Sequence, residues 1–154
     1  MMNEATTLYE QDFYGWIQHH IALLQQRQFA DLDVDLLIEE LDSMAKRDKH
    51  ELVSHFIILL AHLLKWQFQL QSLTELWQTF QGHSWRSSIR EQRVQILEQL
   101  EMSPSLKPHL LEAVNKAYPK AVKLASDETG FSMKTFPDTC PYTLAQLLDE
   151  RFFP

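Results

Sequence analysis

The run of residues 33–69 contains neither proline nor glycine and repeats its apolar residues at helical spacing, which predicts one long helix. Its inward stripe combines apolar with ionisable side chains: Leu37, Leu41, Met44, Leu59 and Trp66 with Asp48, Glu51, His55 and His62. At about 100° per residue, the four ionisable groups fall within a sector of about 60°. Chains rarely bury such groups unless they are paired, hydrogen-bonded or used. This stripe is therefore the first place to look for a functional site.

The chain as a whole favours helices and one domain. Its 154 residues match the usual size of a single domain, so residues 1–154 are expected to form one. Only three glycines occur, and few β-branched residues lie outside short runs, which favours helices over sheets. We therefore predict an all-α fold: an irregular bundle of four main helices, with a long central second helix and a short C-terminal helix.

Capping patterns place the first elements. Thr7 and Glu10 form a capping-box pattern for a first helix that ends near Gln28. Residues 29–32 then form a short turn, and Asp33 caps the long helix. Apolar side chains surround that helix over residues 52–66, as in a central helix packed on several sides. A break at residues 46–49, where charge crowds, is left open.

The second half of the chain is less regular. Residues 71–83 fit a short helix or a packed turn closed by Gly82, after which Ser84 caps a third helix that ends near Met102. A fourth helix over residues 105–128 carries Pro119 in its interior, which predicts a kink or an interruption. Gly130 fits its C-terminal cap. Residues 131–141 are expected to be irregular and residues 142–151 to form a last short helix.

Charge and hydropathy argue against two classes of partner. Residues 1–80 carry twelve acidic residues against five Lys or Arg, and residues 81–154 carry nine of each, so no nucleic-acid partner is expected. The longest apolar run, residues 56–64, is far shorter than the roughly 20 residues that span a bilayer, so no membrane partner is expected. A single cysteine and the lack of a signal-peptide pattern predict a cytoplasmic location.

A metal site on the long helix is the first functional reading. Glu51 and His55 are four residues apart and share a helical face. His62 lies seven residues beyond His55, roughly 10 Å along the axis, which is too far to share an ion with bonds of about 2 Å. Further ligands would have to come from Asp12, His19 or His20 in the first helix. We expect no metal and no cofactor, and interpret His55 and His62 as hydrogen-bonded core histidines.

Three arginines share one face of the predicted third helix. Arg86, Arg90 and Arg93 are spaced four and three apart. Their guanidinium groups could capture a phosphate or a carboxylate ligand. They could instead pair with the protein's own acids in residues 31–42, and the excess of acid there favours this second reading. Gln92, on the apolar stripe between Ile89 and Ile96, is expected to belong to the same buried polar network as these arginines.

No pattern supports a reaction. Cys140 lies in a segment predicted to be irregular, without a nearby cation to lower its pKa. No glycine-rich phosphate loop and no nucleophile elbow occurs. We therefore predict no catalytic residue, and the sequence leans away from an enzyme.

Several strings resemble a known family. They are residues 9–16 (YEQDFYGW), 37–44 (LIEELDSM), 62–66 (HLLKW), 84–93 (SWRSSIREQR) and 140–144 (CPYTL). Together they resemble the domain of unknown function family numbered twenty-nine, which is abundant in cyanobacteria. The similarity covers nearly the whole chain. It implies an all-helical fold and no established activity, and the stretch 70–83 is longer than the usual link between the family's Lys-Trp and Ser-Trp strings.

The resemblance also singles out polar residues. Those within the shared strings form a candidate ligand-binding polar cluster: Asp12, Glu39, Glu40, His62, Lys65, Trp85, Gln92 and Arg93. His20 and His55 fall outside the family pattern.

Two functions remain open. The first is a cytoplasmic helical protein that binds a protein partner or itself, with an exposed apolar patch around Trp77 and Phe80 as the contact surface. The second is a hydrolase or ligand-binding enzyme whose pocket joins Glu40, His62, Lys65 and Arg93 between the second and third helices.

Overall fold

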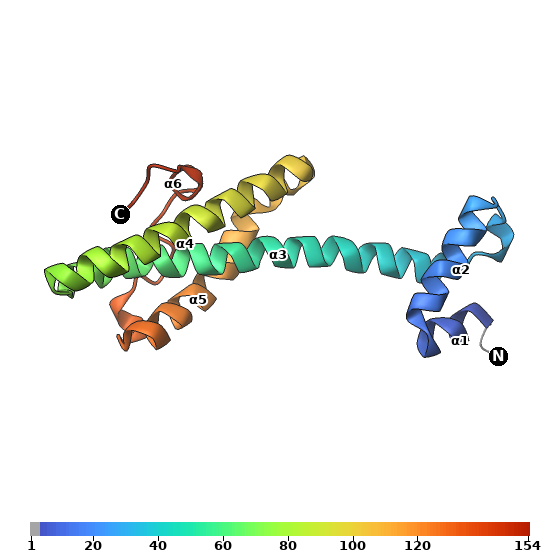
Figure 1. Ribbon diagram of the computed structural model, residues 1–154, viewed down its shortest axis with the longest axis horizontal. Coiled ribbons are helices and arrows are strands. Elements are labelled where there is room, and N and C mark those ends of the chain that lie inside the picture. Colours follow the sequence, from blue (N-terminus) through green and yellow to red (C-terminus); the bar gives the residue numbers. More distant parts are fainter. Residues whose placement is uncertain (1–3) are drawn as a thin grey trace. The chain divides into compact units, whose positions relative to one another are not determined.

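The structure, a computed structural model, describes residues 4–154 apart from the side chains of residues 5, 6 and 71. Within these residues the α-helices are α1 (Glu4–Gln11), α2 (Phe13–Gln25), α3 (Val34–Phe68), α4 (Glu75–Met102), α5 (Leu110–Thr129) and α6 (Leu144–Leu148), and no strand occurs (Figure 1). Short 3-10 turns occupy Phe29–Asp31, Leu70–Ser72, Pro104–His109 and Met133–Thr135. The predicted all-α fold, with a long second main helix and a short C-terminal one, is confirmed.

The chain divides into two compact units. The first ends at Arg47, and the second comprises Asp48–Pro154. Helix α3 supplies residues to both units. The expectation of one domain over residues 1–154 stays a prediction.

The predicted start of α3 is confirmed. The Asp33 carboxylate accepts a hydrogen bond from the backbone N–H of Leu36 at 3.1 Å, which satisfies a helix donor that has no partner within the helix. The helix then continues through residues 46–49, so the break left open there is absent. An ion pair between Lys46 and Asp42, one turn apart and 2.9 Å from nitrogen to oxygen, adds a small local stabilisation.

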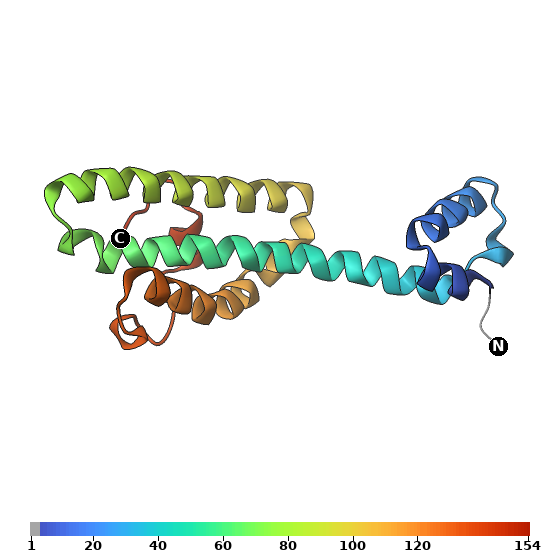
Figure 2. The same ribbon diagram turned by 60° about the horizontal axis from the view of Figure 1, so that its bottom comes forward.

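The core of the second unit forms around the second half of α3. Helices α4 and α5 flank this half of α3 on different sides (Figure 2). The core side chains of α3 are large, and those of α5 are mostly small: Phe56, Leu59, Leu60 and Leu63 against Ala113, Ala117, Ala121 and Ala125. The alanines allow the two helices to approach closely, and Ile89 and Ile96 of α4 complete the core. The predicted central helix packed on several sides is confirmed.

The ionisable stripe of α3 is less buried than predicted. Asp48 and Glu51 are exposed, whereas His55 and His62 are half-buried. Leu41 and Met44, assigned to the inward stripe, are 64% and 54% exposed. Helical spacing identifies residues that share a face, but a face is buried only where a neighbour covers it.

The first predicted helix is wrong in its start and its continuity. It is two helices, and Thr7 lies inside α1. Asp12 separates α1 from α2 as the N-cap of α2, since its carboxylate accepts a hydrogen bond from the backbone N–H of Gly15 at 3.0 Å. A Cβ atom at Gly15 would come within 2.5 Å of that carboxylate. The Asp-x-x-Gly pattern is therefore the local signal for the second helix.

The predicted start of the third helix at Ser84 is also wrong. Helix α4 begins at Glu75 and contains both Gly82 and Ser84. Gly82 is buried, and a Cβ atom there would meet Leu70 of the preceding 3-10 turn at 3.9 Å. One glycine lowers helix stability by only about 1 kcal/mol relative to alanine, so Gly82 by itself does not end the helix.

Helix α5 differs from its prediction in two ways. Residues 104–109 form a 3-10 turn, so the α-helix begins at Leu110. It then continues past the exposed Pro119, and the interruption predicted there is absent. The buried residues of this helix, including Ala117, Tyr118 and Ala121, pack in the core and stabilise the helix in spite of the proline. Gly130 has φ +77° and ends the helix in the left-handed region, as predicted.

Residues 131–154 form a C-terminal arm that packs on the second unit. Phe136, Tyr142 and Leu147 are buried in its core. The arm contains α6, which starts with a capping box between Thr143 and Gln146. The half-buried thiol of Cys140 donates a hydrogen bond to the backbone carbonyl of Tyr142 at 3.5 Å, and burial raises the pKa of this thiol. This residue is therefore a poor nucleophile.

Candidate functional site

The predicted polar cluster is divided between the two units. Asp12, Glu39 and Glu40 belong to the first unit, and His62, Lys65, Trp85, Gln92 and Arg93 to the second. In the first unit, Asp12 caps α2, and Glu40 accepts a hydrogen bond from the Tyr9 hydroxyl. This hydrogen bond raises the pKa of Tyr9, and the negative charge of Glu40 raises it further. Glu39 is exposed to solvent.

Three of the predicted residues come together in the second unit. The buried ammonium group of Lys65 pairs with Glu128 and lies 6.0 Å from the ring centre of Trp85. Burial lowers the pKa of Lys65. His62 donates a hydrogen bond from Nδ1 to the backbone carbonyl of Ile58 at 2.8 Å. Its pKa is lowered by burial and also by the charge of Lys65. Each group thus has an internal partner.

Gln92 lies in a separate polar group. Its side-chain oxygen accepts a hydrogen bond from His55 Nδ1 at 2.8 Å, which joins α4 to α3. The Glu51 carboxylate lies 3.6 Å from His55 Nε2. Gln92 therefore contacts His55 of α3, and its membership of one polar network with the three arginines stays a prediction. Among residues 4–154, no three His, Cys, Asp or Glu side chains are grouped so that they could hold a metal ion.

Arg93 holds the C-terminal arm to α4. It is only 1% exposed and donates to two backbone carbonyls of α6, from Nε to Leu147 at 2.8 Å and from an Nη to Gln146 at 3.1 Å. Its other Nη is buried without a hydrogen-bond partner. The ring of Phe153 lies 5.6 Å from its guanidinium carbon. Arg93 therefore has N–H donors at this nitrogen that no protein group accepts.

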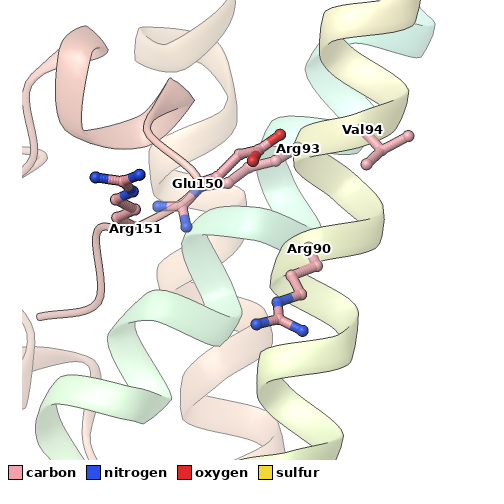
Figure 3. A pocket seen from close by; sticks show the side chains of 5 residues that line it. All are labelled: Arg90, Arg93, Val94, Glu150 and Arg151. Carbon is pink, nitrogen blue, oxygen red and sulfur yellow. The ribbon is translucent and has the colours of Figure 1, made fainter.

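That arginine also lines a pocket of about 370 Å³ between α4 and the arm (Figure 3). The lining residues are Arg90, Arg93, Val94, Glu150 and Arg151. The first three come from α4 and the last two from the arm. Sequence spacing identified Arg90 and Arg93 but missed Glu150 and Arg151, because no local pattern indicates where an irregular arm packs.

The three predicted arginines do not act as one group. Arg86 lies over the rings of Trp66 and Phe153, with its guanidinium carbon 5.4 and 5.0 Å from their centres. Such contacts are cation–π interactions. The acids of residues 31–42, proposed as partners of the arginines, belong to the first unit. The pairing of Arg86, Arg90 and Arg93 with those acids stays a prediction.

The first unit contains an apolar groove of about 260 Å³. Its lining comes from two helices: Phe13, Trp16, Ile17, His20, Ile21 and Leu24 of α2, with Leu37, Glu40, Leu41, Met44 and Arg47 of α3. Tyr9 and Phe13 meet the buried Trp16 ring at 5.1 and 6.1 Å between centroids. Phe13 itself is 44% exposed.

His20 fixes one wall of this groove. It is 2% exposed. Its Nε2 accepts a hydrogen bond from the backbone N–H of Asp33 at 3.1 Å, which requires that nitrogen to be unprotonated. Nδ1 then donates to the carbonyl of Trp16, also at 3.1 Å. The neutral imidazole thus ties α2 to the residue that caps α3.

The patch predicted around Trp77 and Phe80 is exposed. Both residues lie near the start of α4 with Leu76, and the two rings meet edge to face at 6.0 Å between centroids. A shallow depression beside them is lined by Leu76, Thr79, Phe80, His83, Ser84 and Ser87. This patch is an exposed apolar surface that shares no residue with the groove of the first unit.

Together these features define a small all-α protein with an exposed apolar groove and an arginine-lined pocket. In the described residues, no helix is both long and apolar enough to cross a membrane. The chain belongs to the family whose model is described as Domain of unknown function DUF29, which matches residues 8–153. No curated protein and no solved structure matches this chain. The resemblance read from the sequence strings is therefore confirmed.

Proposed function

We propose that this chain is a protein-binding module, and that the groove between α2 and α3 receives a basic amphipathic helix of a partner protein. The observation that carries the proposal is the exposure of the groove. Leu24, Leu41 and Met44 are large and apolar, and they are 46%, 64% and 54% exposed although they line one groove. Contiguous apolar surface of this kind is typical of interaction sites.

The size of the first unit explains why the groove needs a partner. A unit of fewer than about 50 residues seldom buries a sufficient core by itself. Among the described residues of this unit, only Trp16, His20 and Leu23 are buried. A docked helix would cover the apolar side chains that the unit leaves exposed.

The geometry of the lining favours a helix as occupant. On α2 the lining residues recur at positions 13, 16, 17, 20, 21 and 24, and on α3 at 37, 40, 41, 44 and 47. Both series follow the spacing of three and four residues that marks a single helical face. Two such stripes form a groove into which an amphipathic helix can lay its own apolar face.

Charge selects the kind of helix. Residues 1–47 carry nine acidic residues against three Lys or Arg, which leaves six net negative charges out of seven for the whole chain. Asp12, Asp35 and Glu39 are exposed. Lysine or arginine on the polar face of the partner would meet this field, whereas a second copy of the same unit would be repelled by it.

The test uses the full chain and two labelled peptides. Both peptides are amphipathic helices with leucine on one face, one with lysine and the other with glutamate on the opposite face. Fluorescence anisotropy is expected to show that the lysine peptide binds and that the glutamate peptide does not. Leu41→Asp is expected to weaken binding by about tenfold or more, because it places a charge at the centre of an apolar contact.

A matched variant distinguishes the groove from the second apolar surface. Trp77→Ser combined with Phe80→Ser removes apolar surface from α4 and is expected to leave binding unchanged. If this double variant abolishes binding and Leu41→Asp does not, the patch around Trp77 and Phe80 is the contact surface and the groove proposal is wrong. A dimer in sedimentation velocity that Leu41→Asp dissociates would identify a second copy as the occupant, against the proposal.

A further inference from the structure

The arginine pocket at the C-terminal arm contains more positive charge than the protein itself neutralises. Three guanidinium groups, of Arg90, Arg93 and Arg151, and one carboxylate, of Glu150, line it. The carboxylate of Asp149 also acts on Arg93, so the three guanidinium groups exceed the two nearby carboxylates by one positive charge. Val94 supplies its apolar wall.

The side chain of Arg93 is buried and held in one position by the protein, unlike an exposed surface arginine. Its guanidinium is held in place by the carbonyls of Leu147 and Gln146, so it cannot move freely toward solvent. The buried Nη that has no partner carries two N–H donors that the protein does not use. Figure 3 shows Arg93 extending from α4 toward the segment of Glu150 and Arg151, with Arg90 one turn away on the same helix.

We propose that this pocket binds the dianion of a phosphate monoester. Such a group supplies negative charge where the arginines exceed the nearby carboxylates, and its oxygens accept the paired N–H donors that arginine presents. A volume of about 370 Å³ accommodates a phosphate with a small organic substituent beside Val94. Because Arg93 also holds α6, an occupied pocket stabilises the packing of the arm on α4.

The probes are inorganic phosphate and O-phosphoserine, with chloride at the same ionic strength as the reference. Isothermal titration calorimetry is expected to show one site for each phosphate probe and none for chloride. Arg90→Gln and Arg151→Gln change exposed side chains and keep the fold; each is expected to weaken binding by about tenfold. Glu150→Gln removes a repelling carboxylate and is expected to tighten binding severalfold.

The control is Lys123→Gln, which removes the same charge from the exposed surface of α5 and is expected to leave the affinity unchanged. The proposal is overturned if neither phosphate probe binds, or if Lys123→Gln weakens binding as much as Arg90→Gln does, since the effect would then be one of net charge. Tight binding of O-phosphoserine with none of inorganic phosphate assigns the pocket to phosphorylated amino-acid groups, and equal binding assigns it to phosphate itself; both support the proposal.

Discussion

The ammonium group of Lys65, buried on α3, pairs with the carboxylate of Glu128 near the end of α5. Glu128 itself is half exposed, so the two partners do not contribute equally. Removal of the carboxylate leaves a buried positive charge, whereas removal of the ammonium leaves a carboxylate that water can still reach.

Glu128→Gln is therefore expected to lower the free energy of unfolding by about 1–3 kcal/mol. Lys65→Met keeps the length and packing of the side chain and is expected to cost less. The double variant is expected to be more stable than Glu128→Gln alone, because no charge is then left buried. Urea denaturation of the four proteins measures the cycle; additive effects of the two substitutions would show that the pair is not coupled.

The stability of the second unit is expected to fall in weak acid partly because of His62. Burial lowers the pKa of its imidazole, so the folded protein binds a proton less readily than the unfolded chain, in which histidine titrates near pH 6.5. The contribution of neutral His62 is complete above about pH 6.5 and is lost as the pH falls below that value. Thermal unfolding between pH 8 and pH 5 is expected to show a smaller drop in Tm for His62→Gln than for the wild type. His50→Gln, at an exposed position on the same helix, is the control and is expected to keep the wild-type drop.

The two hydrogen bonds from Arg93 to α6 predict that lysine cannot replace it. Lysine keeps the charge but lacks the planar fork that reaches two carbonyls from one position. Arg93→Lys is expected to destabilise the protein by about 1–3 kcal/mol, since buried carbonyls lose a partner. Arg90→Lys, one turn earlier and exposed, is expected to change stability by less than about 0.5 kcal/mol. Equal effects of the two substitutions in urea denaturation would contradict the structural role of Arg93.

Pro119 offers a substitution that is expected to stabilise the protein. It lies inside α5 on the exposed face and removes one helical hydrogen bond. Pro119→Ala is expected to raise the free energy of unfolding by about 1–2 kcal/mol, less than the full helix penalty because proline also restricts the unfolded chain. Lys120→Ala, the neighbouring exposed position, provides the reference. A loss of stability in Pro119→Ala would mean that α5 depends on the distortion that proline imposes.

Local signals predicted those parts of the fold that depend on local interactions. Asp33 caps α3 and Gly130 ends α5, because each of these outcomes follows from the residue and its immediate neighbours. The apolar residues of α3 between Leu52 and Leu64 surround the helix, so most of them enter the core whichever sides the neighbouring helices cover. The start of α4, in contrast, was missed. Gly82 reads as a helix end in the sequence, but it lies buried in the interior of α4.

The residues of the candidate sites were also predicted only where a local pattern marks them. Spacing placed Arg90 and Arg93 on one face of a helix, but the arm that brings Arg151 and Glu150 to them has no periodic pattern. Spacing likewise grouped Leu37, Leu41 and Met44 correctly, yet whether that face is covered depends on what packs against it, which periodicity does not encode.

The position of Cys140 gives the chain an internal reporter. It is the only cysteine, and it lies in the same arm that supplies Glu150 and Arg151 to the arginine pocket. A thiol reagent is expected to reach its half-buried sulfur more readily when the arm separates from the helices of the second unit. The rate at which Cys140 is alkylated is therefore expected to rise when the arm opens, without any added label, and to fall when a ligand holds Arg151 against α4.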